Sequence, residues 1–144
     1  MTVKRLNPLI DEDWDLFYQL CGRVREACRR GLSNFNEDIL VSMLKKGFVN
    51  DSSLFLIVVL NDHNQIISHL VGWIIIEFDK EIFFIHQAVS DVNLGNYISP
   101  IWSEIRMMLP KNVVIRFWTK RVGFERYFKK LGMNVKNKYT LLEV

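Results

Sequence analysis

The chain has 144 residues, of which 49% are apolar and 12% aromatic, so it is the size of one domain with a well-filled core and is not disordered. Its longest apolar runs, Leu54–Leu60 and Leu70–Ile76, are much shorter than the roughly 18 residues that span a bilayer, and its N-terminus has no apolar signal segment. We therefore expect a single domain over residues 1–144, in the cytoplasm and without a membrane partner.

The net charge of +3 is unevenly spread. Residues 113–144 carry eight Lys and Arg residues but only two Glu residues. Such a basic stretch can attract an acidic protein partner or a phosphate, or it can be a solvated face. The basic and aromatic residues between Arg116 and Arg121 match no nucleic-acid reader motif, which argues against a nucleic-acid partner. No Cys, His, Asp or Glu cluster has the spacing of a metal site, so no metal is expected.

The first third of the chain predicts a strand and two helices. Thr2–Leu6 alternates like an edge strand, and the acidic residues from Asp11 to Asp15 open an apolar pattern with helical spacing that Gly31 ends. A second helix is predicted over Asn36–Lys46, with Asn36 as its N-cap. Its inner stripe is expected to consist of Ile39, Leu40, Met43 and Leu44.

The rest of the chain predicts a sheet. Ser53–Asn61, Gln65–Phe78 and Glu81–Val89 are apolar runs separated by short turns, which favours three antiparallel strands. A helix that Pro110 ends, a strand, a helix and a last strand are predicted over Ile98–Met108, Val113–Thr119, Phe124–Leu131 and Met133–Leu142. The order β-α-α-β-β-β-α-β-α-β predicts a mixed α/β sheet with helices on both faces. Its buried core should include Trp73, Ile75, Phe84 and Trp102.

This order resembles that of the GNAT superfamily of N-acetyltransferases. Val71-Gly72-Trp73 resembles the step in the family's third strand, Ala88-Val89-Ser90 the end of its fourth strand, and the segment Phe128 to Met133 the end of its last helix. The resemblance implies the GNAT fold, acetyl-CoA as cofactor and an amine as acyl acceptor. In size, and in the changes described next, the chain is also similar to small GNAT-like proteins that some bacteriophages encode.

The resemblance implies an acetyl-CoA loop after Val89, where the family aims backbone N–H groups at the pyrophosphate. The matching residues are Leu94, Gly95, Asn96, Tyr97 and Ser99, and Arg121 stands where many members have Asn. Tyr97 replaces the first glycine of the family pattern, so its ring would meet the phosphate. The segment is therefore either an altered cofactor loop or an ordinary loop that opens a helix.

The catalytic residues depart from the family too. Phe128 stands where many members have a tyrosine that reprotonates the thiolate, and Tyr127 beside it is the remaining candidate acid. His86 and Glu81 on the fourth predicted strand are the candidate bases. Strict alternation turns His86 away from the family's usual face unless a β-bulge shifts the register. Two hypotheses stay open: an N-acyltransferase with an eroded signature, or a non-catalytic GNAT-like binding or structural protein.

Overall fold

The computed structural model describes residues 1–33, 35–118, 123–130 and 141–143. Along the chain these residues form eleven elements. In order they are β1 (Thr2–Arg5), α1 (Asp11–Arg29), α2 (Glu37–Asn50), β2 (Leu54–Leu60), β3 (Ile66–Glu77), β4 (Lys80–Ser90), the 3-10 helix η1 (Gly95–Tyr97), α3 (Ile98–Met108), β5 (Val114–Trp118), α4 (Gly123–Lys130) and β6 (Leu141–Glu143). The predicted order of strands and α-helices is confirmed.

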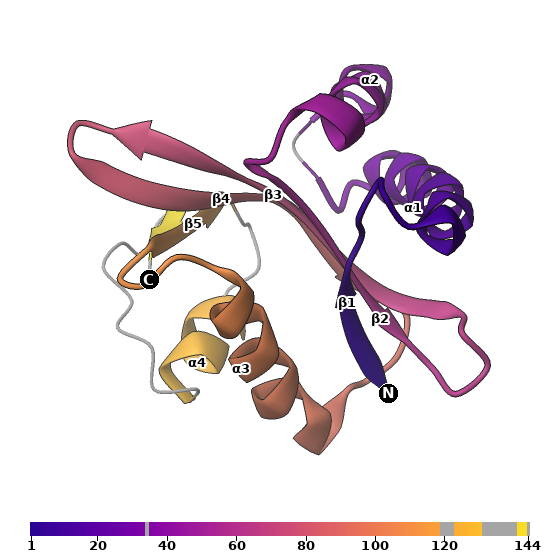
Figure 1. The fold of residues 1–144 in the computed structure, drawn as a ribbon. Helices are drawn as coiled ribbons and strands as arrows, with labels where there is room; N and C mark the ends of the chain where they lie inside the picture. The colour runs from indigo at the N-terminus through magenta and orange to yellow at the C-terminus, as the bar shows by residue number, and fades with distance from the viewer. Residues whose placement is uncertain (34, 119–122, 131–140, 144) are drawn as a thin grey trace.

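The strands form one sheet in the order β1-β2-β3-β4-β5-β6. Every neighbouring pair is antiparallel except β4 and β5, which run parallel because the crossover through α3 joins them. Helices α1 and α2 cover one face of the sheet, and α3 and α4 cover the other (Figure 1). The predicted mixed sheet with helices on both faces is therefore correct.

Two apolar cores lie on the two faces of the sheet. Every residue of β2 is buried, because its even-numbered side chains pack under α1 and α2 and its odd-numbered ones pack under α3. Trp73 is buried as predicted, whereas Phe84 and Trp102 are half-buried. The prediction for Ile75 was wrong, because this residue is exposed. The pairing of β2 with β3 stops at Leu54, the first residue of β2, which lies opposite Trp73. Ile75 therefore lies in the part of the β3–β4 hairpin that extends beyond β2.

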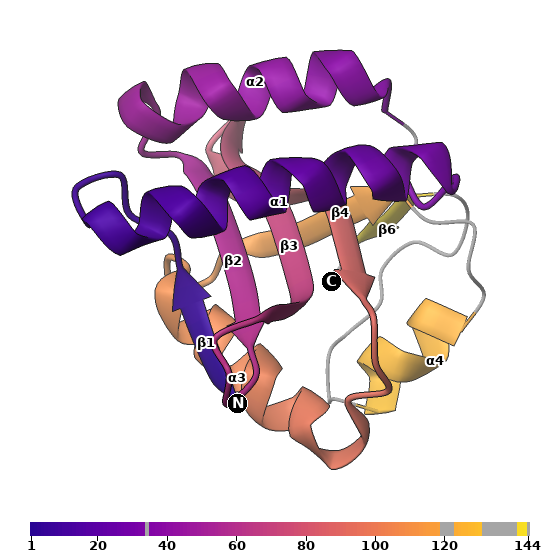
Figure 2. The ribbon, with the colours of Figure 1, turned by 90° about the vertical axis from the view of Figure 1, so that its right-hand side faces the viewer.

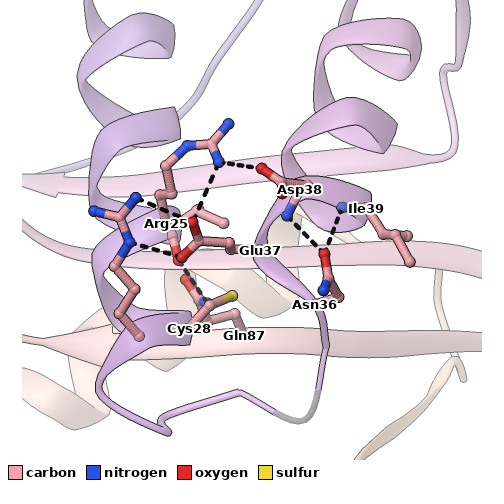
Figure 3. A network of polar contacts seen from close by, with 9 residues as sticks. Arg25, Cys28, Asn36, Glu37, Asp38, Ile39 and Gln87 are labelled. Carbon is pink, nitrogen blue, oxygen red and sulfur yellow. Dashed lines mark hydrogen bonds and ion pairs between the residues drawn. The ribbon is translucent and has the colours of Figure 1, made fainter.

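The connection between α1 and α2 is held by polar contacts (Figure 3). Asn36 caps α2 as predicted, since its Oδ1 accepts the amide N–H groups of Asp38 and Ile39 at 2.9 and 3.2 Å. Arg29 donates two hydrogen bonds to the Glu37 carboxylate, at 2.8 and 3.0 Å, and Arg25 pairs with Asp38 at 2.5 Å. These contacts join the end of one helix to the start of the next.

The phase of the buried stripe on α2 differs from the prediction. Leu40 and Leu44 are buried as expected, but Ile39 is 61% exposed and Met43 is also exposed. The stripe continues instead through Val41, Gly47 and Phe48. The helix is therefore rotated by about one residue relative to the predicted face, or about 100°.

The last predicted strand, Met133–Leu142, lies mostly outside the described residues, and β6 covers its end and the residue that follows. Within the described part of the chain, no helix is long and apolar enough to cross a membrane.

Candidate functional site

Strands β4 and β5 separate halfway along β4. Their parallel pairing starts at Ile82–Val114 and ends at Ile85–Phe117, whereas β4 continues to Ser90 beside β3. Figure 2 shows β4 running on from there toward the start of α3. Within the part of the chain that the structure describes, the second half of β4 therefore pairs with β3 on one side and with no strand on the other.

The separation begins at a β-bulge. Val71 pairs with Gln87 and Gly72 pairs with Ile85, so His86 is the extra residue of β4. The bulge turns the His86 ring into an aromatic cluster on the α1 side of the sheet. The ring stacks on Phe35 with centroids 4.5 Å apart and meets the edge of Trp73 at 4.7 Å. The bulge that the sequence allowed for His86 is thus present.

The environment of His86 keeps its imidazole neutral at pH 7. Burial lowers the pKa of His86 to about 4. Its Nδ1 is buried and has no hydrogen-bond partner in the described structure. A buried N–H without an acceptor is more costly than a bare nitrogen, so the favoured tautomer has its lone pair on Nδ1 and its proton on Nε2. The free lone pair of this neutral ring therefore lies on the buried Nδ1.

A buried polar network lies beside the bulge. His69 Nε2 and Gln87 Oε1 are 2.6 Å apart, and Arg23 Nε donates to His69 Nδ1 at 3.2 Å. Arg23 also pairs with both carboxylate oxygens of Asp91, at 2.5 and 3.1 Å. Because Nδ1 accepts from Arg23, the His69 proton lies on Nε2 and is donated to Gln87. Burial lowers the pKa of His69 to about 4, so this ring is also neutral.

Sequence reasoning missed this network. None of its four residues, His69, Arg23, Gln87 and Asp91, was singled out as a candidate. The available signal was a pair of polar residues, His69 and Gln87, each inside an apolar strand, since a buried polar group needs a partner. The network holds Gln87, the residue after the bulge, and connects it to Asp91 at the start of the loop that follows β4.

The expected cofactor loop is a short helical turn that follows an Asx-turn at Asn93. Asn93 Oδ1 accepts the Gly95 N–H at 3.0 Å, and the Tyr97 N–H donates to the Leu94 carbonyl at 3.0 Å. Two of the amide groups that the family's pattern would present to a phosphate are therefore used within the chain. Tyr97 is 61% exposed, whereas Leu94 is buried in the core under α3. Gly95 has φ of +52°, which favours glycine.

The other candidate residues are scattered. Val89 is half-buried near the end of β4, and Asn96 and Ser99 are exposed at the start of α3. Glu81 is exposed at the hairpin end of β4, opposite Ile76. It lies four residues before Ile85, where the pairing with β5 ends, so the two residues are roughly 13 Å apart along the strand. The structure thus brings Val89 and the Leu94–Ser99 segment near the open half of β4, and it places Glu81 apart from them.

Helix α4 carries the remaining candidates. Phe128 is buried, with its ring in edge contact with Trp102 of α3 at 5.3 Å between centroids. Tyr127 precedes it in the helix, but the Tyr127 side chain and the whole of Arg121 lie outside the described residues. No group of three or more His, Cys, Asp or Glu residues in the described ranges is arranged to hold a metal ion.

The sequence matches no protein-family model and no curated protein. Solved structures of similar fold are nevertheless numerous. One described as a probable acetyltransferase has a TM-score of 0.68 at 11% identity, over 96% of this chain and 93% of that one. Tetrahymena GCN5 has a TM-score of 0.60 at 14% identity, over 99% and 94% of the two chains. A mutant of the spermidine N-acetyltransferase SpeG from Vibrio cholerae has a TM-score of 0.64 at 10% identity, over 99% and 92%.

These likenesses, together with the separated β4 and β5 and the bulge between their paired and open halves, define a class of fold. The chain has the GNAT acyl-CoA N-acyltransferase fold. At 10–14% identity the likeness extends to the fold and not to a particular substrate.

Proposed function

We propose that the protein is an acyl-CoA-dependent N-acyltransferase, with acetyl-CoA as donor and an amine as acceptor. The observation that carries this proposal is the separation of β4 from β5 directly after a bulge that holds a neutral histidine, His86. The solved structures with this fold include acetyltransferases. A neutral imidazole beside the opening can accept the proton of an attacking amine at Nε2 once its own proton has moved to Nδ1 in the other tautomer.

The open half of β4 fits the thin arm of the cofactor. The Asp91 N–H donates to the Ile67 carbonyl of β3, so by antiparallel alternation Val89 directs its backbone groups to β3 and Ala88 directs its own to the open edge. Ala88 therefore offers one N–H and one C=O to an amide-containing arm. When bound, acetyl-CoA would supply an acyl group already activated as a thioester.

The loop before α3 does not fit the cofactor's diphosphate equally well. Tyr97 projects into solvent there, and the Gly95 N–H is already bonded to Asn93. We expect acetyl-CoA binding by the unchanged protein to be weak. Calorimetric titration with acetyl-CoA measures it directly. Tyr97→Gly, alone and with Asn93→Ala, should strengthen binding because the changes remove the ring and release an amide. Binding that is tight before either change, and weaker after it, would contradict this account of the loop.

In the transfer itself, His86 would take up the proton that the amine loses. A pKa of about 4 makes His86 a weak base at pH 7, so turnover should be slow. Phe128 has no proton to give to the leaving thiolate, so that proton must come from Tyr127 or from water. If Tyr127 is the acid, Tyr127→Phe should lower turnover by about 10²–10⁴. If water is the acid, Tyr127→Phe should be silent and Phe128→Tyr should raise turnover.

The second candidate is a non-catalytic GNAT-like binding protein. The observation that favours it is the bond from the Gly95 N–H to Asn93 Oδ1, which engages an amide of the loop within the chain. Its partner would be an acidic protein surface at the basic C-terminal part of the chain. The two candidates differ in one assay: acetyl transfer to a panel of amines, measured with the wild type and with His86→Ala. Transfer that His86→Ala abolishes supports the enzyme. No transfer by any variant, including Phe128→Tyr, favours the binding protein.

A further inference from the structure

A cavity of about 380 Å³ lies between the sheet and α3. Its floor consists mainly of two rows of paired residues that cross β2, β3 and β4, with His69 and Val89 between the rows. The first row is Ile57–Leu70–Ala88, and the second is Val59–Ser68–Ser90. Its roof is formed by Leu94 and by four residues of α3, Ile98, Ile101, Trp102 and Ile105. The cavity therefore extends across the sheet toward β2, away from the gap between β4 and β5.

Small side chains leave this space open, and the hydroxyl protons of its two serines are already bonded. Three of the six floor residues are Ser68, Ala88 and Ser90, which fill less volume than the branched side chains of the other three. Ser68 Oγ donates to the Val89 carbonyl at 3.0 Å, and Ser90 Oγ donates to the Val92 carbonyl at 2.7 Å. The floor thus has two serines whose hydroxyl protons are engaged, and the roof is apolar. Pockets with such a lining favour apolar ligands.

The exposure of the lining shows where the cavity opens. Ile57, Val59 and Ile105 are buried at its inner end. At the other end Ile98 is half-buried and Ser90 is exposed. The mouth therefore lies at β4 and the first turn of α3, beside the open half of β4 where the proposed acyl donor would lie.

We propose that this cavity binds one unbranched alkyl chain, which enters beside β4 and runs across the floor toward β2. Three strands span two inter-strand spacings, so an extended chain of roughly eight carbons covers the width of about 10 Å. Binding of the alkyl chain itself does not depend on the proposed function. Only the identity of the group at the mouth, a CoA thioester, rests on the proposed function. In an acyltransferase the chain is the acyl group of the donor, and the preferred donor is then a medium-chain thioester. Otherwise a free fatty acid supplies the same chain.

The test is a titration series by calorimetry with the full-length protein. One arm uses acyl-CoA thioesters with even chains from two to twelve carbons, and the other uses the matching free carboxylic acids below their micelle concentrations. Affinity should rise about fourfold for each methylene buried, which is about 200-fold from four to eight carbons. Beyond roughly eight carbons, a chain that has filled the cavity should gain nothing more.

Two variants locate the binding. Leu70→Phe adds bulk to the floor and should remove the dependence on chain length, whereas Ile101→Ala should move the end of the rise to longer chains. Leu56→Phe is the matched control, because Leu56 is buried on the opposite face under α1 and α2. It should bind the series as the wild type does. Circular dichroism and melting temperature confirm that each variant is folded.

The outcomes separate this proposal from the proposed function. A rise with chain length in the free acids, without binding of thioesters, supports the alkyl site and counts against the acyltransferase. Acetyl transfer with equal affinity for all chain lengths supports the acyltransferase and overturns the alkyl site. If affinity continues to rise up to twelve carbons, and does so equally in the wild type and in Leu70→Phe, the chains adsorb to the surface. This result also overturns the alkyl site.

Discussion

Replacing Gly72 by alanine tests how the bulge in β4 is accommodated. Gly72 stands on β3 at the register shift, opposite Ile85. A Cβ atom at this position would lie 2.5 and 2.7 Å from two ring carbons of Phe83 and 2.9 Å from the Phe84 carbonyl oxygen. Real Cβ atoms essentially never approach other atoms so closely, so the neighbours must move. The Phe84 carbonyl belongs to the sheet, and the Phe83 ring is fully buried against Phe55 at 5.4 Å.

The expected loss of stability follows from two opposing effects. Overpacking a filled core costs about 1–3 kcal/mol, and the upper end applies because a backbone atom is among the contacts. Alanine also restricts the unfolded chain, which returns about 0.4–1 kcal/mol. Gly72→Ala should therefore lower the free energy of unfolding by about 2 kcal/mol, measured by urea denaturation at constant m-value.

The control is Gly22→Ala in the middle of α1. A Cβ there would have no atom within 4 Å, so the substitution should stabilise the protein by up to about 1 kcal/mol through helix propensity alone. Phe83→Leu in the Gly72→Ala background should recover part of the loss, because it removes the nearest ring atoms. A Gly72→Ala variant as stable as the wild type would refute the argument that glycine is needed opposite the bulge.

Three further predictions concern α2 and the buried histidine. Asn36→Ala removes the cap of α2 and should cost about 1 kcal/mol in thermal unfolding, so an unchanged melting temperature would count against the cap. Leu44→Ala should cost about 2–5 kcal/mol and Met43→Ala less than about 0.5 kcal/mol. A loss for Met43→Ala as large as that for Leu44→Ala would mean that the buried face of α2 is the one the sequence predicted. Burial lowers the pKa of His69 from 6.5 to about 4, so the stability that neutral His69 provides is present above pH 6.5 and is lost as the pH falls toward 4. From pH 7 to pH 4 the wild type should lose about 3 kcal/mol more than His69→Gln, and parallel urea curves would exclude a buried neutral His69.

The order of elements was predictable from the sequence because each element has its own period and its own boundary residues. The strands Leu54–Leu60 and Ile66–Glu77 are apolar runs bounded by turn residues, and Asn36 is a strong helix start. The rotation of α2 was not predictable. Leu40 and Leu44 belong to two possible apolar stripes on α2. Ile39 and Met43 complete one stripe, and Val41 and Phe48 complete the other, which is equally apolar. Only packing against the sheet decides which stripe is buried.

The candidate site was predictable in its position but not in its geometry. Alternation along Glu81–Val89 carries no glycine or proline to mark a bulge, so the sequence left the direction of His86 open. The cavity under α3 depends on Ser68 and Ser90 being opposite each other across two strands, and that register appears only when the strands are paired. The changed residues Tyr97 and Phe128 were visible directly, because they were compared with a family pattern at fixed positions.

The bulge and the loop are connected by the polar network. Gln87 of the bulge is bonded to His69, His69 to Arg23, and Arg23 to Asp91. Asp91 lies two residues before Asn93, whose side chain accepts the Gly95 N–H in the turn that leads into α3. The Arg23 guanidinium is planar and rigid, so its bond to His69 and its paired bonds to Asp91 cannot be adjusted independently.

This connection decides which substitutions can separate binding from transfer. Asn93→Ala and Tyr97→Gly change an amide and a ring at the loop and leave the Arg23–Asp91 pair in place, so their effects report on donor binding alone. A change at Arg23 or Asp91 would release the loop and the bulge together. Loss of transfer in such a variant would therefore say nothing about His86 unless the donor affinity is measured in the same protein. The acetyl-CoA titration is for this reason the measurement on which every activity assay of this protein depends.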